Sequence, residues 1–102
     1  MKTVEFKSEM GTTHKDFLRL LPRSVPDATI EYSGTAQDGA QIIVENAPLG
    51  RIEVELSAEG ERRIALLALP VTHVVFRFFN VDEDVAKVEL DRMAKYFQRG
   101  GG

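Results

Sequence analysis

The chain has 102 residues, of which 43% are hydrophobic and 28% charged, with a net charge of -3 at pH 7. This composition predicts one ordinary globular domain and excludes the disordered class. The chain has no basic block to neutralise phosphates, which argues against nucleic acid as a partner, and its lack of cysteine excludes disulfides and thiolate chemistry.

The first ten residues, MKTVEFKSEM, contain no apolar stretch typical of a signal peptide, so we expect a cytoplasmic location. Within this segment Val4 and Phe6 alternate with the charged residues Glu5 and Lys7. A period of two is typical of a half-buried strand. We therefore predict a strand near residues 2–10 with one solvated face.

A short helix is predicted after this strand. Thr12 or Thr13 offers a hydroxyl for the N-cap, and an acidic residue in the first turn suits the positive end of a helix. Proline cannot continue a helix, so we expect this one to end before Pro22 and Pro26. His14, at its start, is expected to be exposed. The apolar face of the helix consists of Phe17, Leu20 and Leu21.

Three tripeptides that end in glycine punctuate residues 28–69. A three-residue hairpin loop places its last residue in the left-handed region, where glycine is favoured. We therefore predict an antiparallel meander of four strands joined by three such loops. The tripeptides are Gln37-Asp38-Gly39, Pro48-Leu49-Gly50 and Ala58-Glu59-Gly60.

Loops of this length determine which residues lie opposite each other. Val54 is expected to face Val44 in one neighbouring strand and Ile64 in the other. The remaining opposed pairs are Tyr32 with Val44, Ile42 with Leu56, and Ile52 with Leu66. Apolar residues then face one another on a core side made of Ile30, Tyr32, Ile42, Val44, Ile52, Val54, Leu56, Ile64 and Leu66.

Residues 64–79, IALLALPVTHVVFRFF, form a strongly apolar run. The run is shorter than the roughly 18 apolar residues that a membrane helix needs, and it is rich in β-branched and aromatic residues, so it predicts a buried strand and no membrane association. No glycine, asparagine or aspartate marks a turn beside Pro70, so we expect one strand that bends there. Its second half, residues 71–79, then pairs with the strand near residues 2–10, which otherwise has no partner.

A final helix is predicted after Asn80, because Asn80 and Glu83 have the spacing of a capping box. The acidic triplet at residues 82–84 suits a first helical turn and is not expected to bind metal. We expect a single domain at residues 1–98, followed by a flexible Gly-rich tail at residues 99–102. The apolar stripe of the helix is Ala86, Leu90, Met93 and Phe97, with Ala94 beside it.

The predicted order of elements is β-α-β-β-β-β/β-α, where the slash marks the bent strand. This order predicts an α+β fold with one antiparallel sheet of about five to six strands packed against a long C-terminal helix. The order is similar to that of helix-grip and TATA-binding-protein-like folds. The resemblance covers topology alone and implies no activity.

The functional prediction depends on the two faces of the strand at residues 64–79, because one core covers only one of them. The second face would leave an apolar patch larger than monomers usually expose. We therefore expect a small non-enzymatic interaction module that forms a homodimer through this face or binds an unidentified protein. The residues of this face are Leu67, Leu69, Val71, Val75 and Phe79, with His73 and Arg77 among them.

Two alternatives remain open. One is a carrier or sensor of a small apolar or acidic ligand held between the final helix and the sheet, with His73 or Arg77 as its polar anchor. A buried arginine needs a carboxylate or an acidic ligand, and the candidates for its source are Glu31, Glu53 or a partner chain. The other is an enzyme with His73 as general base, although no catalytic or cofactor motif is recognisable.

An acidic row is predicted on the other face of the meander, where the expected registers align Glu31, Glu45 and Glu53. Arg51 and Arg77 lie close enough in the predicted sheet to compensate these charges, which would leave an ordinary solvated surface. The alternative is a surface that receives a basic peptide or a cation. We favour the compensated surface and predict no metal site.

Overall fold

The computed structural model describes residues 2–100, with side chains described for residues 2–97. Within this range it contains six strands, all paired antiparallel, and two helices. The predicted α+β class and antiparallel sheet are confirmed, and the elements follow the predicted order except at the strand that was expected to bend at Pro70, where two strands pair with each other instead. The elements are β1 (Thr3–Met10), α1 (His14–Ser24), β2 (Thr29–Thr35), β3 (Gly39–Ala47), β4 (Gly50–Leu56), β5 (Gly60–Ile64), β6 (Leu67–Phe79) and α2 (Glu83–Gly100).

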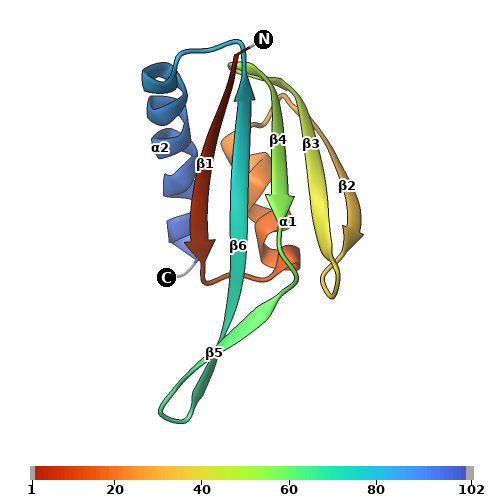
Figure 1. The fold of residues 1–102 in the computed structure, drawn as a ribbon, viewed down its shortest axis with the longest axis vertical. Coiled ribbons are helices and arrows are strands. Elements are labelled where there is room, and N and C mark those ends of the chain that lie inside the picture. Colours follow the sequence, from red (N-terminus) through yellow and green to blue (C-terminus); the bar gives the residue numbers. More distant parts are fainter. Residues whose placement is uncertain (1, 101–102) are drawn as a thin grey trace.

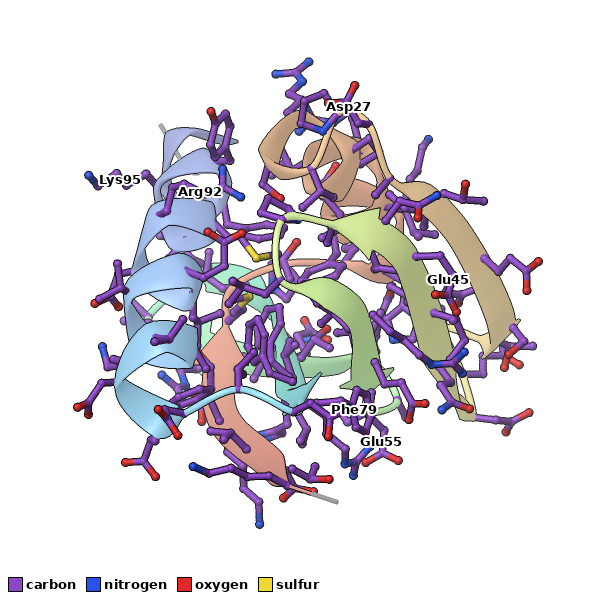
Figure 2. All side chains as sticks on the ribbon, turned by 90° about the horizontal axis from the view of Figure 1, so that it is seen from above. Asp27, Glu45, Glu55, Phe79, Arg92 and Lys95 are labelled. Atoms are coloured by element: carbon purple, nitrogen blue, oxygen red, sulfur yellow. The ribbon has the colours of Figure 1, made fainter. Side chains whose placement is uncertain are left out.

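The sheet has the strand order β1-β6-β4-β3-β2. β5 lies outside this order and pairs with the N-terminal end of β6. Figure 1 shows the long strand β6 between β1 and β4, with the helices behind the sheet. In the view of Figure 2, α1 and α2 lie on the same side of the curved sheet. As far as residues 2–100 are concerned, neither helix combines the length and the apolar character needed to cross a membrane.

The hydrophobic core lies between the helices and the sheet. Alternate residues of β6 point into it, and Phe76 and Phe78 are both 1% exposed. Phe17 of α1 packs against Phe76 and stacks on Phe97 of α2, with the ring centroids of Phe17 and Phe97 4.7 Å apart. The predicted stripe of the final helix is confirmed, since its members Ala86 and Met93 are buried and Leu90 and Phe97 pack against the core.

The prediction that the first strand pairs with residues 71–79 is confirmed. β1 lies antiparallel to β6, with Thr3 opposite Phe79 and Met10 opposite Thr72. Every second residue of β1 faces the core, which agrees with its alternating sequence.

The N-terminus of α2 differs from the prediction. Asn80 has a φ of 59° and does not cap the helix. Its N–H donates to the carbonyl oxygen of Lys2 at 2.8 Å, so Asn80 extends the pairing of β1 with β6. The first helical hydrogen bond runs instead from the N–H of Ala86 to the carbonyl oxygen of Asp82, at 3.0 Å.

The predicted Gly-rich tail lies partly outside the described residues. α2 extends to Gly100, so the helix continues into the first part of the segment expected to be a tail. Residues 101 and 102 are not among those that the structure describes.

The first helix begins as predicted but ends later. Thr13 is the N-cap, and its hydroxyl accepts a hydrogen bond from the N–H of Asp16 at 3.1 Å. The helix does not end before Pro22, which lies within its last turns, and it continues to Ser24. Pro22 removes the N–H that would bond to the carbonyl oxygen one turn back, and the helix continues despite this loss. At its end the hydroxyl of Ser24 donates to the carbonyl oxygen of Leu21 at 2.8 Å.

The β2–β3 hairpin is displaced by two residues from the predicted register. Tyr32 lies opposite Ile42, two positions away from its predicted partner. The cause is the loop, which consists of residues 36–38, because Gly39 pairs with Thr35 and belongs to β3. Gly39 has a φ of 99°, so glycine is needed here as expected, but inside the strand.

The β3–β4 hairpin shows the same displacement, with Val44 opposite Ile52. A two-residue loop joins Ala47 and Gly50, and a bulge at Asn46, which has a φ of 65°, takes up the difference. A shift by two leaves each side chain on its predicted face. The core members Ile42, Val44, Ile52, Val54 and Leu56 are therefore buried as predicted, although their neighbours differ.

β4 pairs with β6 and not with the segment after the third glycine loop. Val54 lies opposite Phe76, so the predicted pairing of Val54 with Ile64 is wrong. The chain reverses between β5 and β6 at Ala65 and Leu66, and Ala65 has a φ of 55°. Ile64 and Leu66, which were predicted in the core, are 53% and 101% exposed.

Candidate functional site

The hairpin of β5 and the first five residues of β6, residues 60–71, is called the arm. It projects beyond the sheet and both helices (Figure 1). Every residue of β5 is exposed, in contrast to the buried centre of β4. The arm nevertheless carries large apolar side chains at and near its tip: Ile64 is 53% exposed, Leu66 101%, Leu67 63% and Leu69 41%.

The arm is a regular antiparallel hairpin. Gly60 lies opposite Val71, and Arg62 lies opposite Leu69. Residues directly opposite each other in a hairpin share a face. The odd-numbered residues of β6 lie on the side of the sheet away from the helices, so they and the β5 residues opposite them form the outer face of the arm. The guanidinium of Arg62 pairs with the carboxylate of Glu9 in β1, which ties the outer face of the arm to the main sheet.

The residues predicted to form an apolar interface share one face of β6 but differ in exposure. Leu67 and Leu69 lie on the arm and are exposed, whereas Val71, Val75 and Phe79 are partly buried. Figure 2 shows that Phe79 and Glu55 both lie on the side of the sheet away from the helices. The apolar surface is thus concentrated on the arm, while charged residues surround the rest of the row.

Arg77 is engaged within the sheet. Its Nε donates to Glu5 at 2.6 Å, and its guanidinium also reaches Glu55 at 3.3 Å. The hydrogen bond to Glu5 is the main reason why the pKa of Arg77 is raised. Neither Glu31 nor Glu53, the candidates from the sequence, pairs with it, so Arg77 holds three strands together and its charge is already compensated.

His73 is exposed, and its backbone is anchored to Ser57. The His73 N–H donates to the hydroxyl of Ser57 at 2.9 Å, and the Ser57 N–H donates to the carbonyl oxygen of His73 at 2.9 Å. The side chain borders an open hollow of about 600 Å³ that is also lined by Ser33, Asp38 and Gln41. Among the described residues no carboxylate is hydrogen-bonded to the His73 ring, so the arrangement of an oriented general base is not formed there.

The predicted acidic row is not continuous. Glu31 and Glu53 lie on opposite sides of Ile43, and Glu45 lies opposite Thr29. Arg51 pairs with Glu45 at 2.6 Å and with Glu53 at 3.2 Å, which is the compensation that we favoured. In the described part of the chain, no group of three or more His, Asp or Glu residues is placed to hold a metal ion.

His14 is buried, contrary to the prediction that it is exposed. It is 3% exposed, and its Nδ1 lies 2.8 Å from the hydroxyl of Tyr32 and its Nε2 2.7 Å from the carbonyl oxygen of Ser57. The backbone N–H of His14 donates to a carboxylate oxygen of Glu59 at 2.7 Å. Burial, followed by the charge of Glu59, raises the pKa of Tyr32. No local pattern indicates this cluster, because its members come from α1, β2 and the base of the arm.

Comparison with models of known protein families gave no match, and comparison with curated proteins gave no relative similar enough to count as one.

Proposed function

We propose that this protein is a non-enzymatic interaction module that self-associates through its arm. The observation that carries the proposal is the exposure of apolar side chains on the arm, above all Leu66 at 101% and Leu67 at 63%. Contiguous apolar surface of this kind is uncommon on monomers and is typical of association sites. The commonest arrangement that covers such a surface in soluble proteins is a symmetric dimer.

The energetics favour several contacts acting together. Fully burying one leucine side chain stabilises an interface by about 1.5–3 kcal/mol, whereas association costs roughly 4–15 kcal/mol in lost freedom. A single leucine therefore does not hold two copies together. The four exposed apolar side chains that each arm provides offer enough surface for a weak dimer when both copies contribute.

The ligand-carrier alternative has less support. Its site would lie between α2 and the sheet, where Phe17, Phe76 and Met93 are at most 1% exposed and pack against one another in the core. A ligand held there would have to displace these side chains. The arm requires no such rearrangement, which is why we prefer self-association.

The proposal is tested by the double variant Leu66→Ser/Leu67→Ser. Both side chains lie outside the core, so we expect the unfolding midpoint in urea of the dilute monomer to stay unchanged, while the dimer that forms at higher concentration dissociates. Sedimentation velocity at several concentrations measures the dissociation. Val88→Ser is the matched control, because Val88 is also apolar and 71% exposed but lies on α2. If the Leu66/Leu67 variant associates as strongly as the control, the arm is not the interface.

A further inference from the structure

The hydrogen bonds of β6 show which edge of the arm is free. The carbonyl oxygen of His73 accepts from Ser57 on the β4 side, and the N–H of Asn80 donates to Lys2 on the β1 side. The backbone N–H and C=O groups of successive strand residues point to opposite edges of the strand. In β6 the odd-numbered residues therefore hydrogen-bond to β4 and β5, and the even-numbered residues hydrogen-bond to β1. Across the arm, the odd residues of β6 face Gly60, Arg62 and Ile64.

Glu61 and Arg63 therefore present their backbone N–H and C=O groups away from β6, along the outer edge of β5. Pro70, which lies opposite Glu61, agrees with this assignment because it has no N–H to donate. The same edge is already used at the base of the arm, where the N–H of Glu59 donates to the carbonyl oxygen of Ala36 at 2.8 Å. Beyond that bond, the next two outward-facing residues offer unpaired peptide groups to another strand.

The opposite edge of the arm is poorly suited to pairing. It belongs to residues 67–71 of β6, where β1 has already ended at Met10. Its outward-facing residues are Ala68 and Pro70, and proline at an edge removes the donor that an added strand needs. The arm is thus protected on the β6 side and open on the β5 side.

We propose that two copies join their arms edge to edge, with β5 antiparallel to β5 of the second copy around a twofold axis beside Arg62. This rests on the proposed self-association and specifies its geometry. In this register Glu61 of each copy forms a hydrogen-bonded pair with Arg63 of the other, and their side chains lie on the same face. Registers that place Glu61 opposite Glu61, or Arg63 opposite Arg63, bring like charges together.

The sequence of β5 is complementary to itself only when the two strands run antiparallel, which favours a second copy over an unrelated peptide. The two Arg62 side chains meet near the axis, but each already pairs with Glu9 of its own chain, which offsets their repulsion. Ile64 of each copy lies opposite Gly60 of the other. There it faces a hollow of about 310 Å³, lined in part by Ala58, Gly60 and Val71.

Charge reversal tests this register. Glu61→Arg and Arg63→Glu each place like charges opposite one another in a homodimer, so we expect the dissociation constant of each variant to rise about tenfold. Mixing the two variants restores opposite charges at both pairs. We therefore expect the mixture to form a heterodimer about as tightly as the unaltered protein, as measured by sedimentation velocity with one variant labelled.

The matched control is a mixture of Asp84→Arg and Lys95→Glu, which changes the net charges equally but on exposed positions of α2. If this mixture gains affinity as the arm variants do, bulk attraction is responsible and the register is overturned. Unchanged dimers in both single arm variants also overturn the register, although self-association then stands. A monomeric unaltered protein removes both proposals. Circular dichroism confirms that each variant is folded.

Discussion

The Nε2 atom of His14 lies 2.7 Å from the carbonyl oxygen of Ser57. Because a carbonyl oxygen only accepts, Nε2 donates this bond, and in the neutral imidazole Nδ1 then accepts the hydrogen bond from the hydroxyl of Tyr32. One buried imidazole thus joins the start of α1 to β2 and to the segment that leads into the arm. The sequence predicted no role for it.

We expect His14→Ala to lower the free energy of unfolding by about 2–4 kcal/mol, because it removes two hydrogen bonds and leaves the Ser57 carbonyl without its partner. Urea denaturation measures the change. Lys15→Ala, at the neighbouring exposed position, is the control and should cost less than about 0.5 kcal/mol. Equal effects of the two substitutions would show that the cluster contributes nothing.

The pKa of Tyr32 is raised by burial and by Glu59, so its hydroxyl should ionise above the usual value of about 10. The chain has two tyrosines, and in Tyr96→Phe only Tyr32 titrates. Absorbance at alkaline pH should then give a midpoint above that value. Between pH 10 and the pKa of Tyr32 in the folded state, the folded protein retains the hydroxyl proton that the unfolded protein has lost. The contribution of Tyr32 to stability is therefore complete below pH 10 and disappears as the pH rises through the folded pKa. A midpoint at or below about 10 would refute the environment described for Tyr32.

Arg77 joins β6 to β1 and β4 through exposed carboxylates, and such pairs contribute little. We expect Arg77→Gln to lower the free energy of unfolding by about 1 kcal/mol or less, with a smaller effect at high salt because the charges are screened. Thermal melts at low and high salt measure both. Self-association should persist in this variant, since Arg77 lies away from the arm. Its loss would assign Arg77 to the interface.

Pro22 lies inside α1, where its ring removes the N–H that would bond one turn back. We expect Pro22→Ala to raise the free energy of unfolding by about 1 kcal/mol, because alanine restores the donor and favours the helix. Pro26→Ala, just beyond the helix, should give no such gain. A stability loss at Pro22 would mean that the proline shapes the end of α1.

The fold was largely predictable because face alternation survives errors of register. The partner of Tyr32 in β3 and the partner of Val44 in β4 each differ by two residues from the predicted one. Each side chain nevertheless kept its face, so the core residues of β3 and β4 were predicted correctly. Periodicity is a local property and is read directly from the chain. Loop length was less certain, because Gly39 adopts a positive φ inside a strand and not as the last residue of a loop.

The arm was missed because its turn has no turn residue. Ala65 adopts a φ of 55° without being glycine, asparagine or aspartate, the residues that mark such turns. The long apolar run therefore predicted one continuous strand, and Ile64 and Leu66 were assigned to the core. The prediction of an exposed apolar surface nevertheless had a correct basis, because this run contains more apolar side chains than one core covers.

The most direct measurement is sedimentation velocity of the unaltered protein between about 1 and 100 μM, a range that brackets weak dimers. Self-association through the arm predicts a species that shifts with concentration from the chain mass of 11.4 kDa toward twice that mass. A single species of 11.4 kDa at every concentration would contradict it.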